Sequence, residues 1–215
     1  MKRRALVLLC AVAAYATYFA PSSRLRDGVR TLCGCPAYAG PWLALEHLLL
    51  DSTLTALSCA TVWTLLARAG WMPPLADTLR LARPRRILFW GVVGGLSALA
   101  AGIGMMAIAA PEELGYIPPS GWKILGNLFS NFYEELIYRA FLVTALEVAL
   151  GSFWAAAALS SFAFGYAHAQ YPVPLRALIG ASGLLWCWTR RRTGSLWTPY
   201  LSHELLDVIG DSLLR

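Results

Sequence analysis

The stretch NFYEELIYRAF, residues 131–141, places two adjacent glutamates and an arginine in the middle of a long apolar run. Apolar residues dominate on both sides of it, from Leu125 to Leu150. An ionised carboxylate in apolar surroundings costs several kcal/mol unless a partner compensates it. These charges therefore need a neutralising partner and a function that justifies their position.

The composition of the whole chain predicts a polytopic membrane protein. Of its 215 residues, 58% are hydrophobic and only 14% are charged, whereas a soluble domain has about 45–50% apolar and about 25% charged residues. The apolar excess lies in long blocks, and no repeat or low-complexity segment separates them. We expect a single all-α domain over residues 1–215, a bundle of about seven transmembrane helices, with six or eight as alternatives.

The expected spans measure roughly 16–28 residues, against about 20 needed to cross about 30 Å of hydrocarbon. They lie near residues 5–20, 42–66, 87–110, 123–150, 152–170, 173–189 and 195–214. The fourth is long, so a tilt or a break is expected there. The small residues of GVVGGLSALAAGIG, 91–104, are typical of tight helix packing. Trp186, Trp188 and Trp197 lie near span ends, where interfacial aromatic belts are expected.

Basic residues are distributed asymmetrically between the two predicted sides of the membrane. With the N-terminus inside, the cytoplasmic side holds eleven of them: Lys2, Arg3, Arg4, Arg68, Arg80, Arg83, Arg85, Arg86, Arg190, Arg191 and Arg192. The other side holds six: Arg24, Arg26, Arg30, Lys123, Arg176 and Arg215. This favours a cytoplasmic N-terminus, and it explains the net charge of +6 through anionic lipid headgroups rather than nucleic acid. The first 23 residues also resemble a signal peptide, but we favour an uncleaved anchor.

Ionisable residues inside predicted spans mark a functional-site hypothesis by default. Most lie toward the C-terminus, and they are Glu134, Glu135, Arg139, His168, which ends FAFGYAH, and His203 and Asp207 in SHELLD. A smaller set in the second span comprises Glu46, His47 and Asp51, and a structural polar contact is the favoured interpretation of it over substrate or cation binding.

Helical geometry separates the two adjacent glutamates. Glu135 and Arg139 are i,i+4 and can pair on one helix face. Glu134 is turned about 100° away and has no such local partner. Asn127, Asn131, Glu135 and Arg139 form a polar stripe that must face protein or water. The helix thus presents one neutralised carboxylate and one available one.

The remaining residues complete a candidate acid–base site. His203 and Asp207 are i,i+4 on the last span, and His168 is i+4 from Phe164 on the fifth. Both glutamates could instead be structural charges paired across the bundle. Together, however, the acids and imidazoles supply what hydrolysis by water requires, and they are also plausible ligands for a divalent metal such as Zn. No GxSxG serine elbow or cysteine lies near the histidines in sequence, which disfavours covalent catalysis.

Three short motifs resemble those of the CAAX-protease and bacteriocin-processing family of intramembrane proteases. EELIYR (134–139) is similar to its EExxxR motif, FGYAH (164–168) to FxxxH, and HELLD (203–207) to HxxxN or HxxxD. The resemblance covers about residues 120–210 and implies an all-helical membrane fold with its site inside the bilayer. It implies that Glu134 is the general base and that Glu135 and Arg139 hold the shape of the site. His168 and His203 would orient water or stabilise the oxyanion.

The third motif departs from the best-understood relatives, which have Asn where this chain has Asp207. An asparagine amide can donate to an oxyanion, whereas an ionised aspartate cannot. Asp207 must then be protonated, orient His203, or bind a metal. We favour the glutamate mechanism, with catalytic Glu134, His168, His203 and Asp207. Glu135, Arg139, Phe164 and Asn131 shape that site. The alternative is a metal-dependent protease that uses His168, His203, Asp207 and Glu134 as ligands.

We therefore predict a membrane endopeptidase without a favoured cofactor. Its expected substrate is a membrane-anchored protein or peptide that carries a C-terminal sorting tag, a CAAX-like tail or a leader peptide. The compact, Arg- and Ala-rich chain looks prokaryotic, which favours a sorting-tag protease similar to the myxosortases, in the inner membrane. The alternatives are a non-catalytic immunity or scaffold protein of the same fold, and a proton- or metal-coupled transporter.

Overall fold

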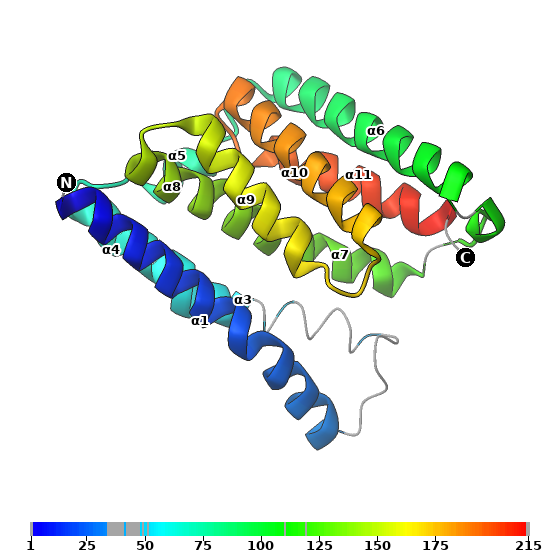
Figure 1. Cartoon of the computed structure of the whole chain (residues 1–215), viewed down its shortest axis with the longest axis horizontal. Helices are drawn as coiled ribbons and strands as arrows, with labels where there is room; N and C mark the ends of the chain where they lie inside the picture. Colours follow the sequence, from blue (N-terminus) through cyan, green and yellow to red (C-terminus); the bar gives the residue numbers. More distant parts are fainter. Residues whose placement is uncertain are drawn as a thin grey trace.

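Helices form every element in the part of the chain that the structure describes (Figure 1). This computed structural model describes residues 2–33, 41, 48, 50, 52–109, 111–118 and 120–213. The elements are, in chain order, α1 (Lys2–Cys33), α3 (Ser52–Thr55), η2 (Ala56–Ala60), α4 (Thr61–Arg68), α5 (Leu75–Thr78), α6 (Pro84–Ala109), η3 (Pro111–Glu113), α7 (Gly121–Glu134), η4 (Glu135–Leu142), α8 (Val143–Leu150), α9 (Phe153–Ala167), α10 (Val173–Thr193) and α11 (Trp197–Leu213). Since no strand occurs among these residues, the predicted all-α fold class is confirmed.

Two helices differ from the predicted spans. α1 continues through Pro21 to Cys33, well beyond the expected end near residue 20. The fourth span does not break: α7, η4 and α8 follow one another without interruption from Gly121 to Leu150, and η4 is a π-helix. A π-helical segment is rare and is often found at functional sites. The set Glu46, His47 and Asp51 lies outside the described residues.

Successive long helices run in alternating directions, so their ends gather into two groups (Figure 1). We call one group the arginine end, because it carries the basic residues of the segments 2–4, 68, 80–86 and 190–192. Hydrogen bonds hold its segments together: Arg3 Nη2 donates to the carbonyl of Gly70 at 3.1 Å, and Ser195 Oγ donates to the carbonyl of Arg80 at 2.9 Å. The basic segments predicted to share one side of the membrane therefore do lie together.

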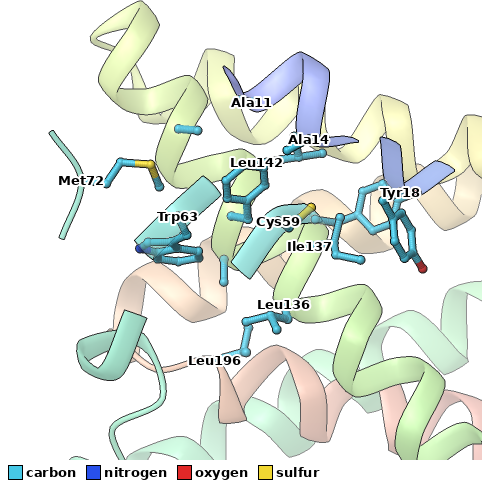
Figure 2. Packing of buried hydrophobic residues seen from close by; sticks show 14 of the residues in the cluster. Ala11, Ala14, Tyr18, Cys59, Trp63, Met72, Leu136, Ile137, Leu142 and Leu196 are labelled. Atoms are coloured by element: carbon cyan, nitrogen blue, oxygen red, sulfur yellow. The ribbon is translucent and has the colours of Figure 1, made fainter. Parts of the chain in front are cut away.

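The core of the bundle forms around η4 (Figure 2). Ile137 and Phe141 of η4 are completely buried, and Val7 of α1 and Trp63 of α4 are buried in the same cluster. The rings of Trp63 and Phe141 lie 6.1 Å apart. This apolar packing fixes the helix that carries both glutamates, so their side chains cannot turn away without disturbing the core.

α6 and α11 approach each other closely along a line of glycines, which confirms the predicted tight packing. A Cβ atom at Gly91 would lie 2.7 Å from Leu201 Cδ2, and one at Gly94 would lie 2.6 Å from Ser202 Oγ. Ser202 Oγ also donates to the carbonyl of Gly91 at 2.9 Å. Because His203 follows Ser202, this contact sets the position of that imidazole.

One helix in the described residues is long and apolar enough to cross a membrane, Pro84–Ile108 of α6. Only 28% of its most apolar window is buried inside the protein, so most of this apolar surface is uncovered in the structure. Large apolar side chains such as Phe89, Phe162 and Ile108 point outward, each more than half exposed. Seven crossings, the cytoplasmic N-terminus and the single-domain organisation remain predictions.

Candidate active site

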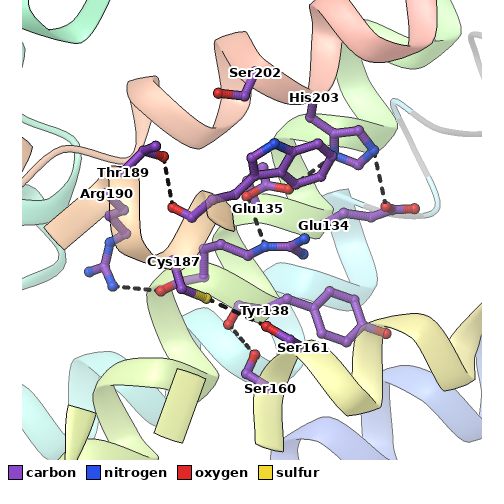
Figure 3. Close-up of polar contacts among 12 residues, drawn as sticks. Glu134, Glu135, Tyr138, Ser160, Ser161, Cys187, Thr189, Arg190, Ser202 and His203 are labelled. Carbon is purple, nitrogen blue, oxygen red and sulfur yellow. Dashed lines mark hydrogen bonds and ion pairs between the residues drawn. The ribbon is translucent and has the colours of Figure 1, made fainter. Parts of the chain in front are cut away.

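A buried ion pair forms the base of the site (Figure 3). Arg139 Nε lies 3.3 Å from Glu135 Oε2, with the two side chains 1% and 0% exposed. The i,i+4 spacing within one helix brings them together, as the sequence predicts. The guanidinium also lies over the ring of Phe164 at 3.8 Å and that of Trp186 at 5.1 Å. Breaking a buried pair of this kind leaves an uncompensated charge, which is strongly destabilising.

His203 of α11 is held by this ion pair. Its Nδ1 lies 3.0 Å from Glu135 Oε1, and the residue is only 5% exposed. Because Glu135 is paired with Arg139, its carboxylate is ionised and can only accept hydrogen bonds. Nδ1 of His203 therefore donates to Glu135, and the other ring nitrogen, Nε2, is directed into the site. The ring of Trp186, 4.6 Å away, covers one side of the imidazole.

Two further carboxylates face Nε2 of His203. Glu134 Oε2 lies 4.0 Å from it and Asp207 Oδ2 lies 3.7 Å from it. Both side chains are partly exposed, at 28% and 29%. Asn131 of α7 donates from Nδ2 to Asp207 Oδ2 at 3.0 Å. The ion pair of the site is thus buried, whereas the carboxylates of Glu134 and Asp207 are accessible to solvent.

The ring of Phe164 contacts both histidines that the sequence predicts for the site. Its ring centroid lies 4.6 Å from that of His168 and 5.8 Å from that of His203. His168 follows the last residue of α9, and its Nδ1 lies 2.8 Å from the carbonyl of Phe164. A carbonyl only accepts, so Nδ1 of His168 is the donor in this hydrogen bond. Phe164 is therefore a central contact residue, as predicted for a site-shaping side chain.

The residues of the metal-dependent alternative do not form a ready metal site. The described residues contain no group of three or more His, Cys, Asp or Glu side chains arranged to hold a metal ion. His203 directs Nδ1 to Glu135, and His168 directs Nδ1 to a backbone carbonyl, which leaves both Nε2 atoms available as in metal-ligating histidines. The metal-dependent mechanism therefore stays an alternative prediction, and we derive no step through a metal.

Three residues of the site could not be assigned from the sequence. Trp186 is 1% exposed and covers His203, so its prediction as an interfacial residue is wrong. Gly183 leaves room for Arg139, whose Nη2 would lie 2.9 Å from a Cβ atom at that position. Glu204 is 8% exposed, and its carboxylate lies near the Asn131 amide without a hydrogen-bonding geometry. Of these three, only Glu204 could have been noticed in the sequence, as a second carboxylate within SHELLD.

The fold and the site together define an all-helical protein with a buried acid–histidine centre next to an outward-facing apolar helix. Residues 118–209 match the model of the family described as type II CAAX prenyl endopeptidase Rce1-like. Its members are proteases and integral membrane proteins. Neither the curated proteins nor the solved structures gave a match to the chain. The matched segment contains every residue of the site, from Asn131 to Asp207.

Proposed function

We propose that the chain is an intramembrane endopeptidase in which Glu134 activates water to hydrolyse a peptide bond. The observation that carries this proposal is the different position of the two adjacent glutamates. Glu135 is sealed and occupied by Arg139 and His203, whereas Glu134 is partly exposed and lies across from His203 Nε2. A general base must reach water, and the partial exposure of Glu134 supports that role.

The reaction needs only proton transfers between water, Glu134 and the substrate. Glu134 takes a proton from water as the water oxygen bonds to the scissile carbonyl carbon. The carbonyl oxygen becomes an oxyanion, which a proton on His203 Nε2 can stabilise. Glu134 then gives its proton to the leaving nitrogen as the carbon–nitrogen bond breaks, which leaves a carboxylic acid and an amine.

Asp207 is proposed to orient His203 rather than to contact the oxyanion. It accepts a hydrogen bond from Asn131 and lies 3.7 Å from the imidazole Nε2. A carboxylate in that position can only accept, so it supports a protonated Nε2. His168 is proposed to be the second imidazole of the site, since Phe164 contacts both rings.

The proposed substrate is a membrane-associated precursor that carries a C-terminal sorting tag, a CAAX-like tail or a leader peptide. The matched family supports a substrate anchored in the membrane, because its name denotes endopeptidases of prenylated CAAX proteins. The exposed apolar surface of α6 supports the same setting. A multi-pass topology in a prokaryotic inner membrane, with the N-terminus in the cytoplasm, is part of this proposal.

The test is cleavage of a library of membrane-anchored peptides by purified protein, with wild type compared with Glu134→Gln. This nearly isosteric change removes the base, and cleavage should fall by about 10²–10⁴-fold. Glu147→Gln is the matched control, because Glu147 is a partly exposed glutamate on α8 of the same continuous helix. It should cleave within twofold of wild type.

Three other outcomes separate the alternatives. Loss of cleavage in chelator, restored by added metal, would replace the glutamate mechanism with the metal-dependent one. Peptide binding by wild type without any cleavage would favour the immunity or scaffold protein. Ion or solute flux that Glu134→Gln alters, without peptide products, would favour a transporter.

A further inference from the structure

A concave site lies at the arginine end, apart from the residues of the candidate active site. It is a cavity of about 370 Å³, lined by Arg86 of α6, Trp154 of α9 and Trp188, Arg191 and Arg192 of α10. Three of its five lining side chains are cationic and the other two are indoles. Its lining contains no carboxylate, so the cavity is suited to an anion.

Aromatic rings hold two of these guanidinium groups in place without neutralising them. Arg192 lies over the ring of Trp188 at 5.0 Å, and Trp188 in turn packs edge-on against Trp90, with centroids 5.0 Å apart. Arg191 lies over Phe153 at 4.1 Å. A cation on an aromatic face retains its charge and its N–H donors, and planar guanidinium groups match the geometry of phosphate oxygens.

The carboxylates near the cavity leave most of its charge uncompensated. Glu147 pairs with Arg191 at 3.4 Å, and both side chains are about half exposed. Within the described residues, neither Arg86 nor Arg192 forms an ion pair with a carboxylate. Two uncompensated cations beside each other repel unless an anion joins them.

An apolar surface continues from the cavity along α9. Trp154, at the start of this helix, is 57% exposed, and Leu159, Phe162 and Tyr166 are 51%, 72% and 61% exposed farther along it. On α6, Phe89 lies one turn beyond Arg86 and is 59% exposed. A ligand that fits both parts must carry an anionic group at one end and an apolar body at the other.

We propose that this cavity binds the phosphate headgroup of an anionic phospholipid, with an acyl chain lying against the exposed face of α9. Arg86 and Arg192 contact the phosphate oxygens, and Trp154 and Trp188 contact the glycerol region. Indoles are favoured at this depth of a membrane because one side of the ring is apolar and the N–H is polar. The observation that carries the assignment is the combination of unpaired guanidinium groups with a continuous exposed apolar stripe.

The proposed lipid site and the candidate active site lie near opposite ends of α9. Trp154 is the second residue of that helix and His168 follows its last residue. Fourteen residues at 1.5 Å each separate them by about 20 Å. Changes in the cavity can therefore be tested without touching the residues proposed for catalysis.

The test is native mass spectrometry of the full chain, delipidated in detergent and titrated with dioctanoyl phosphatidylglycerol, dioctanoyl phosphatidylcholine or inorganic phosphate. Wild type should bind one phosphatidylglycerol, roughly tenfold more tightly than phosphatidylcholine, because both headgroups offer a phosphate but the choline cation would lie among the arginines of the cavity. The double variant Arg86→Gln/Arg192→Gln should lose that preference. The control Arg80→Gln/Arg85→Gln removes two exposed charges from the same end but none from the cavity, and it should bind as wild type does.

Two more variants keep the result interpretable if the glutamine variant folds poorly. Arg86→Lys/Arg192→Lys keeps the charge and should retain the preference for phosphatidylglycerol. Trp154→Ala should weaken the binding of both lipids to a similar extent. Equal loss in the cavity and control variants, or equal affinity for the two lipids, would overturn the proposal. Inorganic phosphate that binds as tightly as the lipid would reassign the cavity to a free anion.

Discussion

Two Arg–Glu pairs in this protein have nearly the same local geometry and opposite surroundings. Arg139 lies 3.3 Å from Glu135 and beneath Phe164, whereas Arg191 lies 3.4 Å from Glu147 and against Phe153. The first pair is 1% and 0% exposed, and the second is 54% and 45% exposed. Distance alone therefore says little about what either pair contributes.

Burial decides the difference between the two pairs. An exposed pair is screened by water and typically contributes about 0–1 kcal/mol. A buried pair contributes little net stability either, but removing one partner strands a charge in the interior at a cost of about 3–5 kcal/mol. The buried pair is thus a constraint that fixes His203, and the exposed pair leaves its arginine able to bind something else.

The largest effect should come from Arg139→Met, which removes the buried partner of Glu135. We expect the free energy of unfolding to fall by about 3–5 kcal/mol, because a buried carboxylate is left uncompensated. Titration with SDS in mixed micelles would measure it. An effect below that of Arg191→Met would contradict the distinction drawn from burial.

A smaller loss is expected from Gly94→Val, which disturbs the approach of α11 to α6 and hence the position of His203. The new side chain would meet Ser202 Oγ, 2.6 Å from the Cβ position, and overpacking of this kind costs about 1–3 kcal/mol. Peptide cleavage should fall together with stability. Gly104→Val is the control, because a Cβ atom there has no described neighbour within 4 Å, and it should leave both unchanged.

The smallest effect should come from Arg191→Met, the counterpart of Arg139→Met at the arginine end. We expect a change of about 0–1 kcal/mol in the free energy of unfolding, measured in detergent without added lipid. The remaining Glu147 carboxylate is 45% exposed and can be solvated by water. A loss of several kcal/mol would show that this pair is not a surface contact in the membrane protein.

Much of the fold could be predicted from the sequence because apolar blocks and helical spacing are local properties. The positions of the long helices followed from those blocks, and the close packing of α6 followed from its small residues. The π-helical conformation of η4 could not be predicted, because it depends on how Glu135–Leu142 packs against several other helices. The continuation of α1 beyond Pro21 was likewise not apparent from composition.

In the candidate site, too, local contacts could be predicted from the sequence and long-range contacts could not. The Glu135–Arg139 pair was predictable because both residues belong to one helix turn. The hydrogen bond between His203 and Glu135 and the contact of Trp186 with His203 join segments far apart in sequence. Spacing cannot indicate such contacts, so Trp186 was misassigned. The sequence places Arg86 among the basic residues of one side. It does not indicate the cavity that Arg86 forms together with residues of α9 and α10.

The length of α9 has a consequence for the thickness of the bilayer in which the protein works. Its 15 residues extend roughly 22 Å, while a hydrocarbon core measures about 30 Å. In the proposed membrane setting, a helix that begins at one interface would end short of the other, with His168 still at hydrocarbon depth. The bilayer must then thin around this helix, or water must descend to meet it. Cleavage rates in vesicles of different acyl-chain length should therefore rise as the membrane becomes thinner.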